Sequence, residues 1–239
     1  FPFVQLGVII LFILISYFAF STSRKAEQNQ VWLGLSKETA HQLGTPTSSL
    51  AALMELLRMK DLDKKILKEF EKDVSRLEKI TERFSKIGSK PSLISINLYN
   101  VIMRAVTYIK SRSSENVRFN ISFSEEDELN LPLNAALFEW VIENLCKNAI
   151  DAMNGKGIIN INVQDNIQVA YLDITDTGRG MNKSKFKTIF KPGYTTKERG
   201  WGLGLSLSKR IVEMYHDGKI FVNYSEINKG TTVRIVLKK

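Results

Sequence analysis

The sequence has 239 residues, of which 44% are hydrophobic and 25% are charged, a composition that excludes a disordered or collagen-like chain. Its 34 basic and 25 acidic residues leave a net charge of +9, so the first partner class to consider is a polyanion: a nucleic acid, an anionic lipid surface or a phosphorylated ligand. One cysteine and two histidines exclude an internal disulfide and a zinc site of the usual Cys/His spacing.

Residues 1–20 contain no charged side chain. About twenty helical residues at 1.5 Å each span the roughly 30 Å hydrocarbon core of a bilayer, which predicts a transmembrane helix. Arg24 and Lys25 follow directly, so the positive-inside tendency predicts that the rest of the chain is cytoplasmic. A cleaved signal peptide fits less well because no basic segment precedes the apolar run, and a buried core helix would have a polar face. Because the sequence begins at Phe1 rather than Met, we expect a preceding segment.

Residues 21–90 are rich in charge and have a helical pattern. Apolar residues recur near the 3.5-residue period of a coiled-coil seam. The stripe of the second half consists of Ile66, Phe70, Val74, Leu77, Ile80, Phe84 and Ile87. A short polar stretch at 60–63 predicts a turn, so we expect an antiparallel helical hairpin that carries dimerisation. Two helices alone leave part of the stripe uncovered, which favours a homodimeric four-helix bundle.

Residues 88–92 break the helical pattern and predict a domain boundary, so that 91–239 forms a second domain. Its pattern predicts strands and helices in a mixed order. In chain order we expect a strand at 117–123, a helix at 134–153, strands at 157–163 and 168–175, a helix at 203–215, and a hairpin of 219–224 with 231–237. Because no regular alternation of strand and helix appears, the pattern favours an α/β sandwich, within an α+β chain, over a Rossmann sheet.

Two glycine-rich segments of this domain are candidates for ligand binding. Asp176, Gly178 and Gly180 directly follow a predicted strand, where a carboxylate could accept a hydrogen bond from an exocyclic amine and glycines let the backbone approach a flat ligand. Gly200, Gly202 and Gly204 run into the next predicted helix, whose N-terminal amides could bind a phosphate. Neither segment matches a P-loop, and taken alone the first could be only a turn.

A third candidate is a polar face of the predicted helix at 134–153. Asn144, Asn148 and Asp151 stand four and three residues apart and therefore project from one side, where their oxygens could coordinate a hard cation that also holds phosphates. An ordinary solvated helix face is equally consistent with this pattern. Cys146 faces elsewhere and is expected in the core.

The order and spacing of these segments resemble the nucleotide-binding boxes of sensor histidine kinases. The resemblance rests on Asn144 with Asn148, on Asp176-x-Gly178-x-Gly180, on Phe190 within IFKPGYTTK, and on Gly200-x-Gly202-x-Gly204. The segment AHQLGTP at 40–46 resembles that family's phosphoacceptor box and places His41 on the first helix of the expected hairpin. The resemblance covers nearly the whole chain and implies a Bergerat-type ATP-binding domain.

The resemblance also implies roles for these residues, with ATP and Mg²⁺ as cofactors. Asn148 would hold Mg²⁺, Asn144 and Asp151 would lie beside the phosphates, and Asp176 would bind the adenine amine. Gly178, Gly180, Gly200, Gly202 and Gly204 would shape the pocket and the hinges of its lid, Phe190 would anchor that lid, and Lys197 and Arg199 would reach the phosphates.

The resemblance implies that His41 takes the γ-phosphoryl group of ATP and passes it to an aspartate of a response regulator. Where many members of the family have an acidic residue, this sequence has Gln42, an amide that cannot act as a general base. Thr45 stands one turn after His41, at a position that the family links to phosphatase action. His216, at the end of a predicted helix, is expected to have a structural role that the helix dipole favours, and Gly218 is expected to supply the cap.

Three other functions fit the sequence less well. ATP hydrolases with the same fold resemble E-x-x-x-N, but Asn144 stands where they have the glutamate, and Glu143 lies about 100° further round the helix. A catalytically weak membrane-anchored adaptor would lose the nucleotide boxes, all of which are present. Direct nucleic-acid binding is disfavoured because the sequence has no segment of interleaved basic and aromatic residues. We therefore expect a homodimer in the cytoplasmic membrane of a bacterium, crossing it once within this sequence.

The positive charge is concentrated at 179–199, where seven basic side chains accompany one acidic side chain. This segment lies between the two glycine boxes, where the resemblance places the lid. We therefore expect a triphosphate as the main anionic partner. A smaller part of the positive charge is expected to face the anionic membrane surface.

Overall fold

A computed structural model describes residues 2–58, 67–68, 70–71, 73–75, 77–78, 81–82, 91–197 and 202–239. The chain divides into two compact units, Phe1–Lys90 and Pro91–Lys239, which are described separately.

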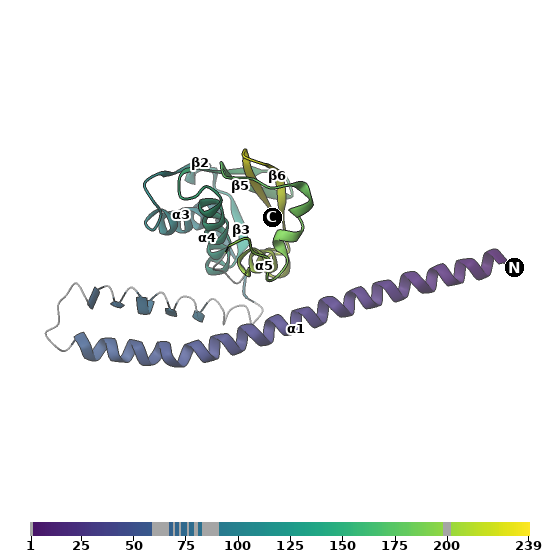
Figure 1. The fold of residues 1–239 in the computed structure, drawn as a ribbon, viewed down its shortest axis with the longest axis horizontal. Helices are drawn as coiled ribbons and strands as arrows, with labels where there is room; N and C mark the ends of the chain where they lie inside the picture. The colour runs from purple at the N-terminus through teal and green to yellow at the C-terminus, as the bar shows by residue number, and fades with distance from the viewer. Residues whose placement is uncertain are drawn as a thin grey trace. The chain divides into compact units, whose positions relative to one another are not determined.

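The first unit begins with the helix α1, Pro2–Arg58 (Figure 1). Its segment Pro2–Ser23 is exposed and is long and apolar enough to cross a membrane. The helix continues without a break past position 41, so the apolar segment and the expected phosphoacceptor box share one helix. Within it, the Thr47 hydroxyl donates to the carbonyl oxygen of Leu43 at 2.5 Å.

The turn expected at 60–63 lies outside the described residues. Those described between 67 and 82 have helical backbone, and Val74 of the predicted apolar stripe is only 2% exposed. Of the other stripe residues, Ile66, Ile80, Phe84 and Ile87 also lie outside the described part of the chain. The dimeric four-helix bundle requires a second chain and stays a prediction.

The second unit is built on a five-stranded sheet in the order β2-β4-β5-β7-β6. The strands are β2 Val117–Ser122, β4 Gly157–Asp165, β5 Val169–Asp176, β6 Lys219–Glu226 and β7 Gly230–Lys238. Only the β2–β4 pair is parallel, and the other three pairs are antiparallel. Alternation along β4 and β5 places Ile159 and Ile161, and Leu172 and Ile174, in the core.

Three helices lie on one side of this sheet, as Figure 1 shows: α3 Leu98–Lys110, α4 Ala135–Ala152 and α5 Gly204–Arg210. This arrangement is the expected α/β sandwich. Helix α4 begins after Asn134, whose Oδ1 accepts a hydrogen bond from the backbone N–H of Leu137 at 3.2 Å. Its apolar face buries Leu137, Phe138, Val141 and Ile142 completely, which fixes the orientation of the opposite, polar face.

The remaining elements are short. A second sheet pairs β1 Ile94–Asn97 with β3 Asn130–Leu133, and single turns form η1 Glu125–Asp127, η2 Lys183–Lys185 and η3 Thr188–Phe190. Helix α5 runs on into a π-helical turn, η4 Ile211–Tyr215. The predicted elements of this unit are confirmed, whereas α3, β1 and β3 are additional.

His216 follows η4 and corrects part of the expectation made for it. The residue that turns into the left-handed region is Asp217, with φ +47°, and not Gly218. A Cβ on Gly218 would instead lie 2.5 Å from the carbonyl oxygen of Val236, so a glycine is needed here because the two backbone segments approach closely. His216 is 5% exposed and burial lowers its pKa, so it is a neutral linker and not a charged partner of the helix dipole.

Candidate functional site

A cavity of about 710 Å³ lies between α4, the turn after β5 and the segment before α5. The residues lining it come from positions far apart in the sequence. Among them are seven that the sequence singles out: Asn144, Asn148, Asp151, Gly180, Lys197, Gly202 and Gly204. The fold therefore brings the polar helix face, both glycine segments and the basic segment to one place.

The polar face of α4 forms one wall. Asn144 and Asn148 are half-buried and Asp151 is exposed, each on the side of the helix that faces the cavity. On the other side, Cys146 is fully buried, and its burial, aided by the negative charge of Glu143, raises the pKa of the thiol to about 12. The core side of the helix is thus apolar and the cavity side carries oxygen atoms. The Asn144 amide nitrogen donates to the Ser208 hydroxyl at 3.5 Å.

Asp176 ends β5 and is only 8% exposed. Its Oδ1 accepts a hydrogen bond from the backbone N–H of Gly178 at 2.8 Å. Burial raises the pKa of this carboxyl group, while hydrogen bonds from the backbone of Gly178 and Thr231 act in the opposite direction. Asp176 and Gly178 lie outside the cavity lining, whereas Gly180 and Thr231, the register partner of Asp176 on β7, line it.

Two glycines of the lining have conformations that other residues rarely adopt. Gly180 has φ +62°, and a Cβ there would lie 1.8 Å from the carbonyl oxygen of Glu226. Gly202 has φ +64°, and a Cβ there would lie 2.5 Å from the carbonyl carbon of Gly193. Both positions combine a left-handed backbone with contact to another backbone segment, so the shape of the cavity depends on them.

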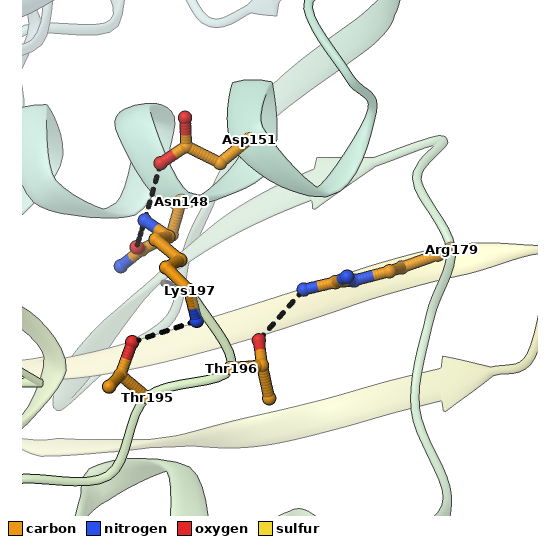
Figure 2. A network of polar contacts seen from close by, with 6 residues as sticks. All are labelled: Asn148, Asp151, Arg179, Thr195, Thr196 and Lys197. Atoms are coloured by element: carbon orange, nitrogen blue, oxygen red, sulfur yellow. Dashed lines mark hydrogen bonds and ion pairs between the residues drawn. The ribbon is translucent and has the colours of Figure 1, made fainter. Parts of the chain in front are cut away.

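The basic segment 179–199 contributes Arg179, Lys185 and Lys197 to the cavity lining, and Lys197 contacts the polar face of α4. Figure 2 shows its ammonium group between two side chains of α4. It donates to Oδ1 of Asn148 at 3.2 Å and forms an ion pair with the Asp151 carboxylate. Phe190 is 7% exposed at the end of η3 and lies outside the lining, although its neighbour Ile189 belongs to it. This placement suits an anchor of the segment more than a ligand contact.

Arg179 contributes a second bond across the cavity. Its Nη2 donates to the hydroxyl of Thr196 at 2.8 Å (Figure 2). The Arg179 backbone is held on both sides, because its N–H donates to Ala152 and its carbonyl accepts from Asn228 at 2.8 Å. The turn that carries Arg179 is therefore tied to its surroundings, and its side chain meets the more exposed segment 195–197.

Several lining residues belong to segments that the sequence singles out, but no individual role was predicted for them. They include Lys147, Arg179, Lys185, Tyr194, Thr195 and Thr196. Arg179 lies between two glycines of a recognised box, and Thr195 and Thr196 directly precede Lys197, so proximity in the sequence was the available signal. Tyr194, whose ring lies 5.7 Å from the ammonium group of Lys185, has the same signal, because it lies within the segment IFKPGYTTK.

Other predicted site residues are not part of this geometry. His41, Gln42 and Thr45 lie on α1 in the first unit, and their side chains are outside the described part of the structure. Arg199 and Gly200 also lie outside the described residues, as does Trp201. Glu143, the nearest carboxylate in sequence to Asn148 on the N-terminal side, is 8% exposed and is not in the lining.

The oxygen atoms of α4 fit a hard divalent cation. Within the described residues, no group of three or more His, Cys, Asp or Glu side chains could hold a metal ion alone. However, the Asn148 amide oxygen and the Asp151 carboxylate converge on one positive charge, the Lys197 ammonium group. Amide and carboxylate oxygens are ligands that Mg²⁺ accepts when phosphates complete its coordination.

Known proteins resemble the part of the chain that carries this cavity. Residues 134–239 match the model of the histidine kinase-, DNA gyrase B- and HSP90-like ATPases. The chain is 28% identical to sporulation kinase C of Bacillus subtilis (strain 168) over 221 residues, 90% of this chain and 51% of that protein. It thus spans about half the length of that relative.

Solved structures agree with this relationship. The catalytic domain of the histidine kinase ThkA, in a nucleotide-free form, gives a TM-score of 0.55 at 26% identity, over 62% of this chain and 97% of that one. ThkA in complex with the response regulator protein TrrA has the same fold, with a TM-score of 0.54 at 23% identity, over 86% of this chain and 61% of that chain.

Proposed function

Because residues 134–239 form a histidine kinase-type ATPase domain in a chain homologous to sensor histidine kinases, we propose that this protein is a membrane-anchored sensor kinase. It transfers the γ-phosphoryl group of Mg–ATP to His41, and from there to an aspartate of a response regulator. The observation that carries the proposal is the cavity, where Asn148 and Asp151 of α4 meet Gly180, Gly202 and Lys197.

The chain's own groups divide the work of nucleotide binding. The Asp176 carboxylate accepts from the adenine amine, and Gly178 and Gly180 let the base approach the backbone. Asn148 would hold the metal ion, with Asn144 and Asp151 beside it, and the cations of Arg179 and Lys197 would neutralise phosphate oxygens. Mg²⁺, when bound, neutralises the phosphate charge. Positioning and charge neutralisation are the protein's main contribution.

The transfer step requires a histidine nitrogen with a free electron pair. A ring nitrogen of His41 attacks the γ-phosphorus, the bond from phosphorus to the β–γ bridging oxygen breaks, and ADP leaves. Gln42 can orient the ring by a hydrogen bond but takes no proton, so the rate depends on solvent or another group for proton removal. The same phosphoryl group then moves to the regulator's carboxylate.

Anchoring, dimerisation and the regulator belong to the same proposal. The exposed apolar segment Pro2–Ser23 supports a single membrane crossing. The apolar residues near 70–77 support a bundle with a second copy of the chain. The resemblance supports a response regulator as the partner. The solved structure of ThkA with the response regulator protein TrrA shows such a complex for those two proteins and supports the same choice.

Nucleotide binding by the full chain in detergent micelles tests the cavity. Asn148→Ala removes the amide oxygen proposed to hold the metal ion, and the affinity for ADP with Mg²⁺ should fall at least about tenfold, as expected for losing a bond to a charged group. Isothermal titration calorimetry gives this affinity. Asn166→Ala, in the exposed turn between β4 and β5, is the control and should bind as the wild type does. Equal affinity of the wild type and Asn148→Ala contradicts the proposed site.

ATP hydrolysis as the main activity is disfavoured by the position of Glu143. A hydrolase of this fold uses a glutamate one turn before the metal-binding asparagine, and Asn144 occupies that place. Glu143 is buried away from the cavity and cannot replace it by a simple rotation. Phosphate release by His41→Gln at the wild-type rate would support the hydrolase instead.

A further inference from the structure

Lys197 occupies the position where the oxygen atoms of α4 converge. Its ammonium group lies 3.2 Å from Oδ1 of Asn148 and pairs with the Asp151 carboxylate, and Figure 2 shows it between the two. These are the two side chains that the proposed function assigns to the metal ion and its surroundings. A cation of the chain itself therefore uses the oxygens on which a divalent ion depends.

We infer that Lys197 is the resident cation of this site and that a divalent metal ion must displace it in order to bind. The inference rests on the proposed function, because it is the binding of Mg–ATP that brings a divalent metal ion to this site. Without a positive charge, Asp151 would present a carboxylate to the arriving phosphates. An ammonium group and a divalent ion cannot both contact the same two oxygens, because their charges would repel at a separation of a few Å.

The displaced lysine stays close to the cavity because the segment has a second attachment. The backbone N–H of Lys197 donates to the Thr195 hydroxyl at 3.1 Å, and Arg179 donates to the Thr196 hydroxyl at 2.8 Å. Neither bond uses Asn148 or Asp151. When the ammonium group leaves α4, residues 195–197 remain tied to Arg179, so the lysine is available for phosphate oxygens. The metal ion then replaces the ammonium group at Asn148 and Asp151, and the same ammonium group becomes free to neutralise the phosphates.

An ordinary surface ion pair is the simpler interpretation, and it makes a different prediction. The Lys197 and Asp151 side chains are 39% and 40% exposed, so the pair contributes little to folding. If Lys197 and Asp151 form only a surface ion pair, replacing Lys197 should leave the affinity for the metal ion unchanged. A competitor for the site would lower metal affinity in the wild type, and its removal would raise it.

The test uses the full chain in detergent micelles without nucleotide. Mn²⁺ is titrated in, and free Mn²⁺ is measured by electron paramagnetic resonance. Lys197→Met should raise the affinity for Mn²⁺ about two- to fivefold, the range expected when a half-exposed ion pair no longer competes. Lys191→Met, an exposed lysine of the same basic segment, is the matched control and should leave the affinity unchanged. Adding Asp151→Asn to Lys197→Met should reverse the gain.

Equal Mn²⁺ affinity of Lys197→Met and the wild type, or weaker binding by the variant, would overturn the inference. Because Lys197 is substantially exposed, we expect the variant to fold, and a circular dichroism melt checks this. The proposed function is judged separately, by whether the wild type binds ADP with Mg²⁺. A chain that binds no ADP refutes the kinase, whereas the Mn²⁺ comparison concerns Lys197 alone.

Discussion

The positions of single side chains in the site depend on contacts between residues far apart in the sequence. Lys197 meets Asn148 and Asp151, which lie 49 and 46 positions earlier. The sequence predicted that all three belong to one site, because the boxes of a known family fix their order. It did not predict that the lysine would take the position of the cation, since that depends on how the segment before 198 folds over α4.

Gly180 gives the sharpest residue-level prediction. Gly180→Ala should destabilise the second unit by about 3 kcal/mol, because the left-handed backbone costs 1–2 kcal/mol and the methyl group collides with the Glu226 backbone. Gly155→Ala is the matched control: Gly155 has φ +77° but nothing within 4 Å of an added Cβ, so only about 1 kcal/mol should be lost. Urea unfolding measures both, and equal losses would show that the contact with Glu226 is unimportant.

The helices and strands show which parts of the fold the sequence could predict. Long elements with a clear period, such as α4 and the hairpin of β6 and β7, were predicted within a few residues of their ends. Helix α3 also has a regular apolar face, formed by Leu98, Val101, Ile102, Ala105 and Ile109, and its omission was an error of interpretation. By contrast, β1 and β3 have four residues each and β3 contains Pro132, so no local signal predicts them.

His216 connects two elements of the site. Its Nε2 accepts from the backbone N–H of Asn134 at the start of α4 (3.1 Å), and Nδ1–H donates to the carbonyl oxygen of Ile211 in η4 (2.9 Å). Protonation of Nε2 breaks the first bond. Helix α4 carries Asn148 and η4 continues from α5, which follows Gly202, so this imidazole fixes the relative position of two walls of the cavity.

This connection predicts the pH dependence of stability. Burial lowers the folded-state pKa of His216 below its ordinary value of 6.5, so the unfolded chain takes up a proton first as the pH falls. The contribution of His216 should be complete above about pH 6.5 and decline below it until the folded-state pKa is reached. Urea unfolding of the wild type and His216→Gln at pH 5.5 and 7.5 measures it, since His41 is present in both proteins. A difference between them that is unchanged or larger at pH 5.5 contradicts this account.

At the scale of the whole molecule, one helix joins the apolar segment Pro2–Ser23 to the segment that we propose as the phosphoacceptor box. Because α1 is continuous from Pro2 to Arg58, a displacement of the apolar segment acts on position 41 through helical backbone alone. The net charge of +9 is likewise unevenly placed, with much of it in the segment beside the cavity. The overall composition could only suggest a polyanion, whereas the fold shows which basic side chains line the site.

The transfer of phosphate from the cavity to His41 requires both units and is the central claim. Full-length protein in detergent, incubated with Mg²⁺ and γ-labelled ATP, should acquire label that is stable to base and labile to acid. The label should be absent from His41→Gln and from Asn148→Ala, and retained by His216→Gln, which removes the other histidine. Label that persists in His41→Gln, or free phosphate released by the wild type without any label on the protein, would contradict the account.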